Sequence, residues 1–186
     1  SSEKGWWLIR ASNTQAALIA RAEGVNQKGL IFLLQEIEKY LTQSRPIDIL
    51  VNNAGLINSR RRLTVDGFEE TFAVNHLAHF LLTGILLPGF NGAGGRIINV
   101  ASGAHGFVRG INYDDLNADR SYRIFKVYGQ SKLANMLFTL ELARRLESRG
   151  ITCNSLHPGA VATRLGSQNE GMVARVLPLL LKPFFQ

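Results

Sequence analysis

A tyrosine and a lysine stand one helical turn apart in the segment VYGQSKLAN, as Tyr128 and Lys132. Side chains four residues apart share a helix face, so the lysine ammonium can lie beside the tyrosine hydroxyl. A nearby positive charge favours the ionised phenol and lowers its pKa from about 10 towards neutrality. The pair therefore fits a general acid and base. Because the same spacing is common on surface helices, the pair predicts chemistry only in combination with other residues.

Short apolar runs predict the strands that must position this pair. They are residues 47–53 (IDILVNN), 95–102 (GRIINVAS) and 151–159 (ITCNSLHPG). Continuous runs of this kind are typical of strands buried on both faces. Residues 67–87 and 131–150 have helical periodicity, and Gly150 is expected to cap the second helix. The alternation of strand and helix predicts a parallel α/β sheet with right-handed crossovers.

Small and polar residues follow each predicted strand. The three clusters are NNAG at 52–55, ASGAHG at 101–106 and HPGAVAT at 157–163. Ligands of parallel α/β sheets bind beyond the carboxyl ends of the strands. Since Tyr128 opens the helix that follows the second cluster, we expect all of these residues to border one crevice.

Composition indicates one globular domain. The chain has 186 residues, of which 46% are hydrophobic and 19% charged, and its formal net charge is +7. This length suits a single domain with a real core. The basic residues are scattered except for an arginine triplet at 60–62 and a pair at 144–145, and no nucleic-acid motif accompanies them. We therefore expect no nucleic-acid partner. The positive charge could instead attract an anionic ligand such as a phosphorylated cofactor.

Cysteine and histidine usage argues against a disulfide framework or a metal site. Cys153 is the only cysteine, which indicates a reducing compartment. The histidines lack the spacing of a zinc motif, so no metal site is expected. They are His76, His79, His105 and His157.

Neither end of the sequence reads as a membrane-spanning or secretory segment. Residues 1–5 lead into WWLIRASNTQ instead of the apolar core of a signal peptide, and no stretch approaches the roughly 20 apolar residues of a spanning helix. The C-terminal VARVLPLLLKPFFQ is apolar but interrupted by Pro178, Lys182 and Pro183. We expect a cytoplasmic protein, with peripheral membrane contact through this segment as an alternative.

Together these residues resemble the short-chain dehydrogenase/reductase family, most closely its retinol-dehydrogenase-like branch. The matching segments are NNAG at 52–55, VNHLAHFLLT around Asn75, RIINVASGAH around Ser102, YGQSKLAN from Tyr128 and LHPGAVATRL from Leu156. The long gap from Ser102 to Tyr128 holds an insertion with a DDLN centre, similar to insertions in that branch. The resemblance covers residues 47–186 and leaves 1–46 as a divergent part of the same domain.

The resemblance implies a Rossmann-like, doubly wound parallel sheet that interconverts an alcohol and a carbonyl by hydride transfer. Tyr128 would exchange the proton at the substrate oxygen, and Lys132 would lower its pKa and bind the nicotinamide ribose. Ser102 would polarise the substrate oxygen, while Asn75 would hold a proton-relay water near Lys132. The implied substrate is small and apolar, such as a retinol-like alcohol, and a homo-oligomer is compatible with the family.

The resemblance also implies a nicotinamide cofactor, NADP by preference over NAD, given the branch and the basic balance. The residues implied to bind it on the adenosine side are Asn52, Asn53, Ala54 and Gly55. Those implied near the nicotinamide carboxamide are Pro158, Gly159 and Thr163, beside Tyr128 and Lys132.

The N-terminal part departs from the family pattern, because the TGxxxGxG turn that binds pyrophosphate is missing. Residues 5–24 allow two alignments. In one they are the first strand and turn, with Ala11, Gln15 and Ala17 in place of glycines. In the other, which we favour, they are the second strand and its helix, and KGLIFLL at 28–34 is the third strand. A G-x-x-G-x-G string at 89–94 precedes a strand and is expected to be a loop.

These departures leave a rival hypothesis. We expect the domain to be incomplete at both ends, because the phosphate turn is missing and because the family continues beyond a KPFF-like segment. The rival is a truncated, non-catalytic relative that acts by associating with another protein.

Overall fold

The structure is a computed structural model. It describes residues 46–90 and 94–159, together with the backbone of 5–11 and 18–24 and the isolated residues 32, 35, 36 and 39. Thr163 and the C-terminal apolar segment lie outside the described residues.

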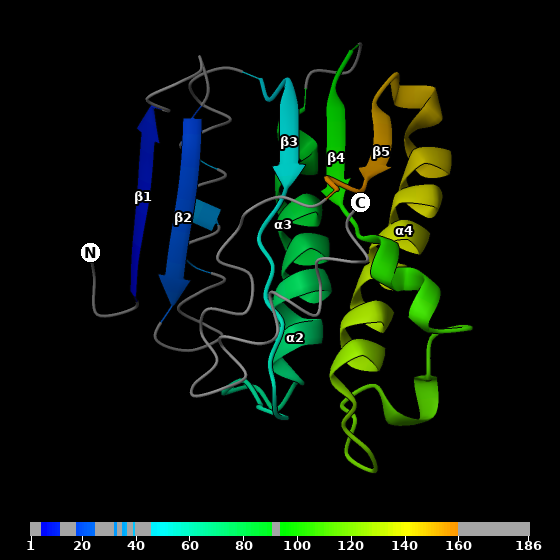
Figure 1. The fold of residues 1–186 in the computed structure, drawn as a ribbon. Helices are drawn as coiled ribbons and strands as arrows, with labels where there is room; N and C mark the ends of the chain where they lie inside the picture. The colour runs from blue at the N-terminus through cyan, green and yellow to red at the C-terminus, as the bar shows by residue number, and fades with distance from the viewer. Residues whose placement is uncertain are drawn as a thin grey trace.

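A parallel sheet forms the centre of the described domain. Its strands are β3 (Ile49–Asn52), β4 (Arg96–Val100) and β5 (Thr152–Leu156), in that order. Asn52 pairs with Asn99, and Ile97 pairs with Cys153. All three arrows point the same way in Figure 1. The parallel α/β architecture predicted from the apolar runs is confirmed, and so is the Rossmann-like fold class.

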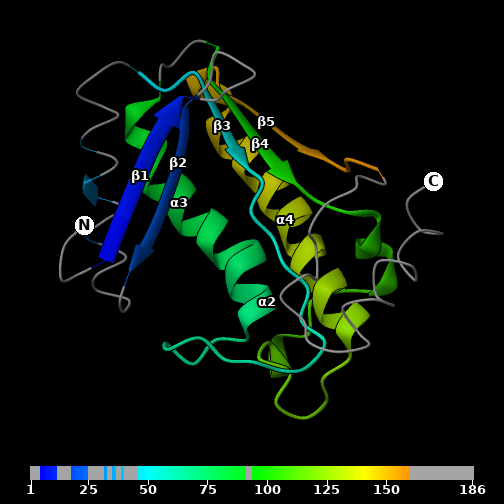
Figure 2. The same cartoon turned by 60° about the vertical axis from the view of Figure 1, so that its left-hand side comes forward.

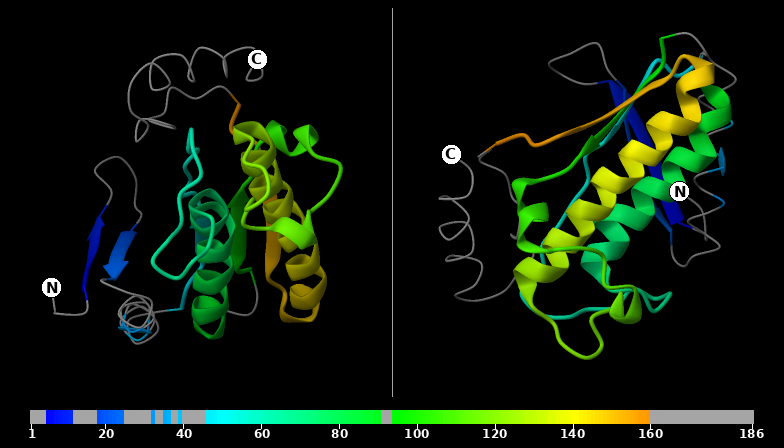
Figure 3. Two further views of the ribbon diagram at one scale, coloured as in Figure 1. Left: turned by 90° about the horizontal axis from the view of Figure 1, so that it is seen from below. Right: turned by 90° about the vertical axis from the view of Figure 1, so that its right-hand side faces the viewer.

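Two long helical segments cover one face of this sheet. The first comprises α2 (Glu70–Phe72), the π-helical turn η1 (Ala73–Leu77), α3 (Ala78–Leu86) and the 3-10 turn η2 (Leu87–Gly89). The second is α4 (Ile124–Leu146), followed by η5 (Glu147–Arg149). Figures 2 and 3 show α3 and α4 lying side by side against the strands.

The ends of these helices follow local sequence signals. Glu69 caps α2 by accepting hydrogen bonds from the amides of Thr71 and Phe72 at 3.0 and 2.7 Å. Gly150 ends the second segment with φ 65°, a left-handed conformation that favours glycine, as predicted for a C-cap. The helix α4 begins at Ile124, seven residues before the predicted start at residue 131, so Tyr128 lies in its second turn and not at its head.

Two apolar clusters hold the layers together. One lies between the sheet and α4 and contains Phe90, Ile97, Leu142, Leu146 and Ile151. The other consists of Ile57, Ala104 and Tyr128, with Ile124 and Phe125 packed against it. The second cluster places the ring of the predicted catalytic tyrosine in the core beyond the carboxyl end of β4.

The other face of the sheet is more open than predicted. Ile49 is 55% exposed and Val51 is 52% exposed, while Asn52 is buried. The expectation that this strand is buried on both faces is therefore wrong. The physical reason is that α3 and α4 cover one face, and no described helix covers the other.

The N-terminal segment contradicts both proposed alignments. β1 (Gly5–Ala11) and β2 (Leu18–Gly24) form an antiparallel pair in which Gly5 lies opposite Gly24. A helix was expected where β2 lies, and Phe32, in the expected third strand, is helical. The runs GWWLIRA and LIARAEG both contain β-branched or large apolar residues, which suit a hairpin as well as a crossover unit.

One described helical segment, Glu70–Gly89, is long and apolar enough to cross a membrane by length and composition. No such stretch was expected from the sequence. Asn75, His79 and Thr83 lie along this segment and are all buried. These polar side chains show that one side of the segment packs against the rest of the domain.

Candidate active site

Tyr128 lies in the second turn of α4 and is only 4% exposed. Burial raises the pKa of its hydroxyl, and a hydrogen bond with Ser102 offsets part of that rise. The predicted lowering of the tyrosine pKa is therefore not found. The reason is geometric, because the Lys132 ammonium lies 5.7 Å from the centre of the tyrosine ring and donates to the Val100 carbonyl at 3.0 Å.

Lys132 is the buried cation of this site. It is 3% exposed, and burial lowers its pKa to about 8. A lysine ammonium has three donors, and the bond to Val100 uses one of them. A Cβ placed on Gly55 would lie 3.5 Å from Lys132 Nζ, so the ammonium borders the Asn-Asn-Ala-Gly turn. The structure thus brings Tyr128, Lys132 and Gly55 together, as the motifs predicted.

The buried lysine predicts a specific pH dependence of stability. Its pKa is about 8 in the folded protein against 10.5 as the reference value, so the unfolded chain binds more protons between these pH values. Stability should rise with pH across that window, and the cost of the buried charge is fully present below pH 8. Over the window, the free energy of unfolding should gain on the order of 3 kcal/mol from this group.

Urea unfolding of the wild type and Lys132→Met between pH 7 and 10.5 measures this effect. The substitution keeps the volume and removes the charge, so the stability advantage of the variant should shrink as pH rises. Parallel curves for the two proteins would rule out a strongly perturbed Lys132.

Ser102 connects β4 to the short helix η3 (Gly103–Phe107). Its hydroxyl accepts a hydrogen bond from the Ala104 amide at 3.2 Å and faces Tyr128. Its carbonyl accepts from His105 Nδ1 at 2.8 Å. Ser102 is therefore both a turn residue and a hydrogen-bond partner of the tyrosine.

Asn75 sits in the middle of the π-helical turn and is fully buried. Its Oδ1 accepts from the Leu56 amide at 2.8 Å, and its Nδ2 donates to the Leu56 carbonyl at 2.9 Å and to Ser131 Oγ at 3.0 Å. A Cβ on Gly55 would lie 3.4 Å from Asn75 Oδ1 and 3.5 Å from Lys132 Nζ. Asn75 and Lys132 therefore flank the same glycine.

The Asn-Asn-Ala-Gly turn divides into two parts. Asn52 Nδ2 points into the core, where it donates to Thr83 Oγ at 2.9 Å and to Asn99 Oδ1 at 2.7 Å. Asn53, Ala54 and Gly55 are exposed at the end of β3. Of the predicted cofactor-binding residues in this turn, these last three line the open side, whereas the Asn52 side chain is committed to the interior.

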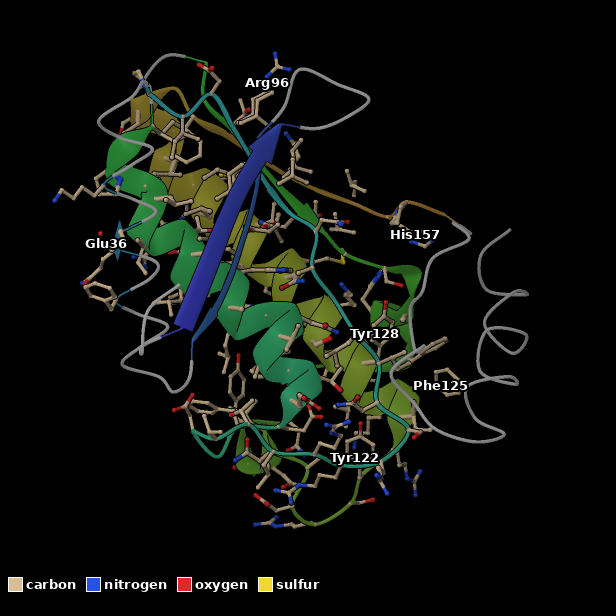
Figure 4. The ribbon with its side chains drawn as sticks, turned by 90° about the vertical axis from the view of Figure 1, so that its left-hand side faces the viewer. Glu36, Arg96, Tyr122, Phe125, Tyr128 and His157 are labelled. Carbon is tan, nitrogen blue, oxygen red and sulfur yellow. The ribbon has the colours of Figure 1, made fainter. Side chains whose placement is uncertain are left out.

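The end of β5 approaches the same region. A Cβ on Gly103 would lie 3.7 Å from His157 Nε2, so the residues after β5 lie beside η3. Pro158 and Gly159 follow directly, and Gly159 has φ 73°. Figure 4 shows His157 and Tyr128 far from Arg96, which marks the amino end of β4.

Sequence reasoning missed a buried polar network behind the site. Asn99 Nδ2 donates to Thr139 Oγ at 2.9 Å, and the Thr139 hydroxyl donates to the Asn135 carbonyl at 2.7 Å. Asn135 in turn contacts Asn75 and His76. The signal was available, because Asn99 interrupts an apolar strand and Asn135 and Thr139 share one face of a helix.

His79 is a buried histidine next to the site. Burial lowers its pKa to about 4, and the charges of Lys132 and His76 add to this effect. The Ala54 backbone opposes the shift, although neither ring nitrogen makes a well-formed hydrogen bond within the described part of the chain. His79 is therefore neutral at pH 7 and packs beneath the Asn-Asn-Ala-Gly turn.

The DDLN insertion is fastened to the loop before α2. Asn117 accepts from the Glu69 amide at 3.0 Å and donates to the Gly67 carbonyl at 3.1 Å. Arg61 binds the Asn117 carbonyl at 2.8 Å and pairs with Asp119, while Arg62 pairs with Glu70 at 3.0 Å. Two arginines of the basic triplet therefore bind acidic or carbonyl groups of this chain.

Comparisons with known proteins agree with this geometry. A family model described as short chain dehydrogenase matches residues 13–173, so the family pattern begins before residue 47, where the sequence resemblance started, and stops short of residue 186. Human retinol dehydrogenase 14 is 46% identical over 149 residues, which cover 80% of this chain and 42% of that protein. Human retinol dehydrogenase 13 is 50% identical over 131 residues, covering 69% and 39%.

Solved structures support the same assignment. A short chain dehydrogenase from Burkholderia cenocepacia, solved in complex with NADP, superposes with a TM-score of 0.56. It is 28% identical in sequence, and the match covers 78% of this chain and 55% of that one. The chain spans less than half the length of the two retinol dehydrogenases. On the family match and these identities, the chain belongs to the short-chain dehydrogenase family, in its retinol-dehydrogenase-like branch.

Proposed function

We propose that this chain carries the active site of an oxidoreductase that uses NADP or NAD to interconvert an alcohol and a carbonyl. The observation that supports this most strongly is the gathering of Ser102, Tyr128, Lys132 and Asn75 at the carboxyl ends of β3 and β4. Members of the same family include a protein solved with NADP, which supports a nicotinamide cofactor.

The proposed roles follow from the contacts of each side chain. Because burial raises the pKa of Tyr128, its hydroxyl is protonated at neutral pH and can donate a proton to a carbonyl oxygen. Ser102 orients that hydroxyl and would bind the same substrate oxygen. Lys132 has donors beyond its bond to Val100 and would bind ribose hydroxyls. Asn75 Oδ1 faces the same glycine as Lys132 and would hold a water there.

The residues after β3 would hold the adenosine side of the cofactor, and those after β5 would lie near its nicotinamide carboxamide. Asn53, Ala54 and Gly55 are exposed beside Lys132, and Pro158 and Gly159 follow the neighbouring strand end. When bound, the cofactor supplies or accepts the hydride, and the protein supplies orientation and electrostatics. NADP is preferred over NAD because the chain carries a net charge of +7.

An apolar substrate is supported by the surroundings of Tyr128. Ile57, Ile124 and Phe125 pack around its ring, and Phe125 meets Phe107 edge to face at 5.8 Å. Phe107 is 39% exposed, so this aromatic pair reaches the surface next to the tyrosine. The relatives named retinol dehydrogenase support the same class of substrate, a small apolar alcohol or carbonyl.

Cofactor titration is the experiment that tests the proposal. A ligand that binds only the folded state raises its stability, by about 2.7 kcal/mol at a concentration of 100 Kd. NADPH should therefore give a saturable change in tryptophan fluorescence and a higher thermal midpoint, with NADH as the comparison. Lys132→Met should weaken binding. An unchanged midpoint at millimolar NADPH and NADH would refute the proposed cofactor use.

A second candidate function is association with another protein without catalysis. One observation favours it: the apolar residues Ile49 and Val51 are exposed on the open face of the sheet. On α3 and α4, Phe80 and Leu140 are also exposed, which suits a homo-oligomer or peripheral membrane contact. Strong binding of a hydrophobic dye together with no response to NADPH would favour this candidate over the first.

A further inference from the structure

The helix that carries Asn75 changes its hydrogen-bond register at that residue. In η1 the Ala78 amide donates to the Ala73 carbonyl, five residues back. π-helical turns are rare and occur frequently at functional sites. A wider turn leaves backbone groups that need partners from elsewhere, and here the partner of Asn75 comes from α4.

That partner is Asn135, which is fully buried. Its Nδ2 donates to the Asn75 carbonyl at 2.8 Å. Because a carbonyl only accepts, this bond fixes which way the Asn135 amide faces. Its Oδ1 then lies 3.0 Å from His76 Nδ1 and must accept the hydrogen bond. His76 Nδ1 therefore carries the proton, and burial lowers the pKa of His76 so that the ring is neutral.

The backbone of Asn135 is anchored as well. Its carbonyl accepts from the Thr139 hydroxyl at 2.7 Å, and that hydroxyl accepts from Asn99 Nδ2 at 2.9 Å. Asn99 Oδ1 accepts from Asn52 Nδ2 at 2.7 Å. A continuous line of buried hydrogen bonds thus joins β3 and β4 to the point on α4 from which Asn135 reaches Asn75.

We propose that Asn135 is a positioning residue that holds the π-helical turn at Asn75 and fixes His76 as its Nδ1–H tautomer. Asn75 in turn binds both backbone groups of Leu56 and places its Oδ1 beside Gly55 and Lys132. Asn135 thereby acts on the site without touching any reacting group. The catalytic consequence rests on the proposed function, whereas the π-helical turn and the tautomer do not.

Two substitutions separate the two bonds of Asn135. Asn135→Asp keeps an oxygen for His76 Nδ1–H but places a second oxygen against the Asn75 carbonyl. Asn135→Ala removes both bonds. Glu141→Gln is the matched control, because it weakens the exposed ion pairs with Arg144 and Arg145 further along α4 and leaves Asn135 and its partners in place.

Hydrogen exchange and histidine NMR give readouts that need no catalysis. Losing one buried hydrogen bond should raise amide exchange in residues 73–80 about tenfold in both Asn135 variants, while exchange along residues 139–146 stays unchanged. The ¹⁵N signature of His76, assigned with His76→Gln, should keep its Nδ1–H form in Asn135→Asp and lose it in Asn135→Ala. Glu141→Gln should leave both readouts as in the wild type.

Kinetics then test the catalytic consequence. Both Asn135 variants should lower kcat about tenfold, with KM for the carbonyl substrate within about twofold of the wild type, because Asn75 acts on the proton and not on substrate binding. Wild-type exchange and an unchanged His76 signature in Asn135→Ala would overturn the inference. If Asn135→Ala does not fold, wild-type exchange in Asn135→Asp would overturn it equally. A third outcome is possible. If amide exchange in residues 73–80 and the His76 tautomer change in the Asn135 variants, but the wild type binds no cofactor, the positioning role is upheld and the proposed function is refuted.

Discussion

Replacing Tyr128 by phenylalanine is expected to lower kcat by about 10²–10⁴-fold, the usual contribution of a general acid or base. The substitution removes only the hydroxyl, and the ring keeps its packing against Ile57 and Ala104. Removing the hydroxyl also removes its hydrogen bond with Ser102, so the free energy of unfolding should fall by about 1 kcal/mol. Initial rates with NADPH and a medium-chain apolar aldehyde, measured beside the thermal midpoint, give both quantities.

Tyr122→Phe is the matched control for this experiment. The Tyr122 hydroxyl donates to the Asn58 carbonyl at 2.9 Å, and burial is the main reason that its pKa rises to about 12. This tyrosine fastens the insertion to the loop between β3 and α2. The control should lower the thermal midpoint and leave kcat unchanged. Full turnover in Tyr128→Phe would remove the tyrosine from the mechanism.

Gly129→Ala is expected to destabilise the protein and to disturb the site. A Cβ on Gly129 would lie 2.5 Å from the Ala104 carbonyl oxygen and 3.4 Å from Phe107 Cβ. Alanine gains about 1 kcal/mol of helix propensity over glycine, but forced packing against backbone costs about 1–3 kcal/mol. We expect the cost of the clash to exceed the gain in helix propensity, because relieving it requires η3 to move as a whole. Since Ser102 precedes η3, its hydroxyl should also shift from Tyr128 and lower kcat/KM.

Gly84→Ala provides the comparison on the other helix. Gly84 lies in α3, and a Cβ there would meet no atom of the described residues within 4 Å. This substitution should raise stability by up to about 1 kcal/mol through helix propensity alone. Urea unfolding of both variants separates the two effects. A Gly129→Ala protein as stable as Gly84→Ala would mean that η3 and α4 do not approach as closely as described.

Much of the central sheet and its helices was predictable from sequence. The apolar runs that end in NNAG and ASGAHG are strands, and the segment around Tyr128 is a helix that ends at Gly150. These elements carry strong local signals, because strand length, helical period and glycine caps are encoded within a few residues. The placement of their polar ends at one edge of the sheet followed from topology, since parallel strands bring their carboxyl ends together.

Other features depend on contacts between distant residues and had no local signal. The strand propensity of residues 5–24 fits a hairpin and a crossover unit equally well. The π-helical turn at Asn75 depends on Asn135, which lies far along the chain. The sequence spacing placed Lys132 near Tyr128, but the ammonium turns to the Val100 carbonyl, so burial and not the lysine charge dominates the pKa of the tyrosine.

The hydrogen bond between Asn52 and Asn99 also has a consequence for how the strands find each other. These residues are direct partners in the pairing of β3 with β4. A slip of one residue would turn the Asn52 amide to the opposite face of the sheet and put an apolar side chain against Asn99. Each misaligned pairing would leave a buried amide without a hydrogen-bond partner, which costs about 1–3 kcal/mol of folding free energy. The asparagine pair therefore selects one alignment of two strands that lie far apart in the sequence, a task that the interchangeable apolar side chains around it cannot perform.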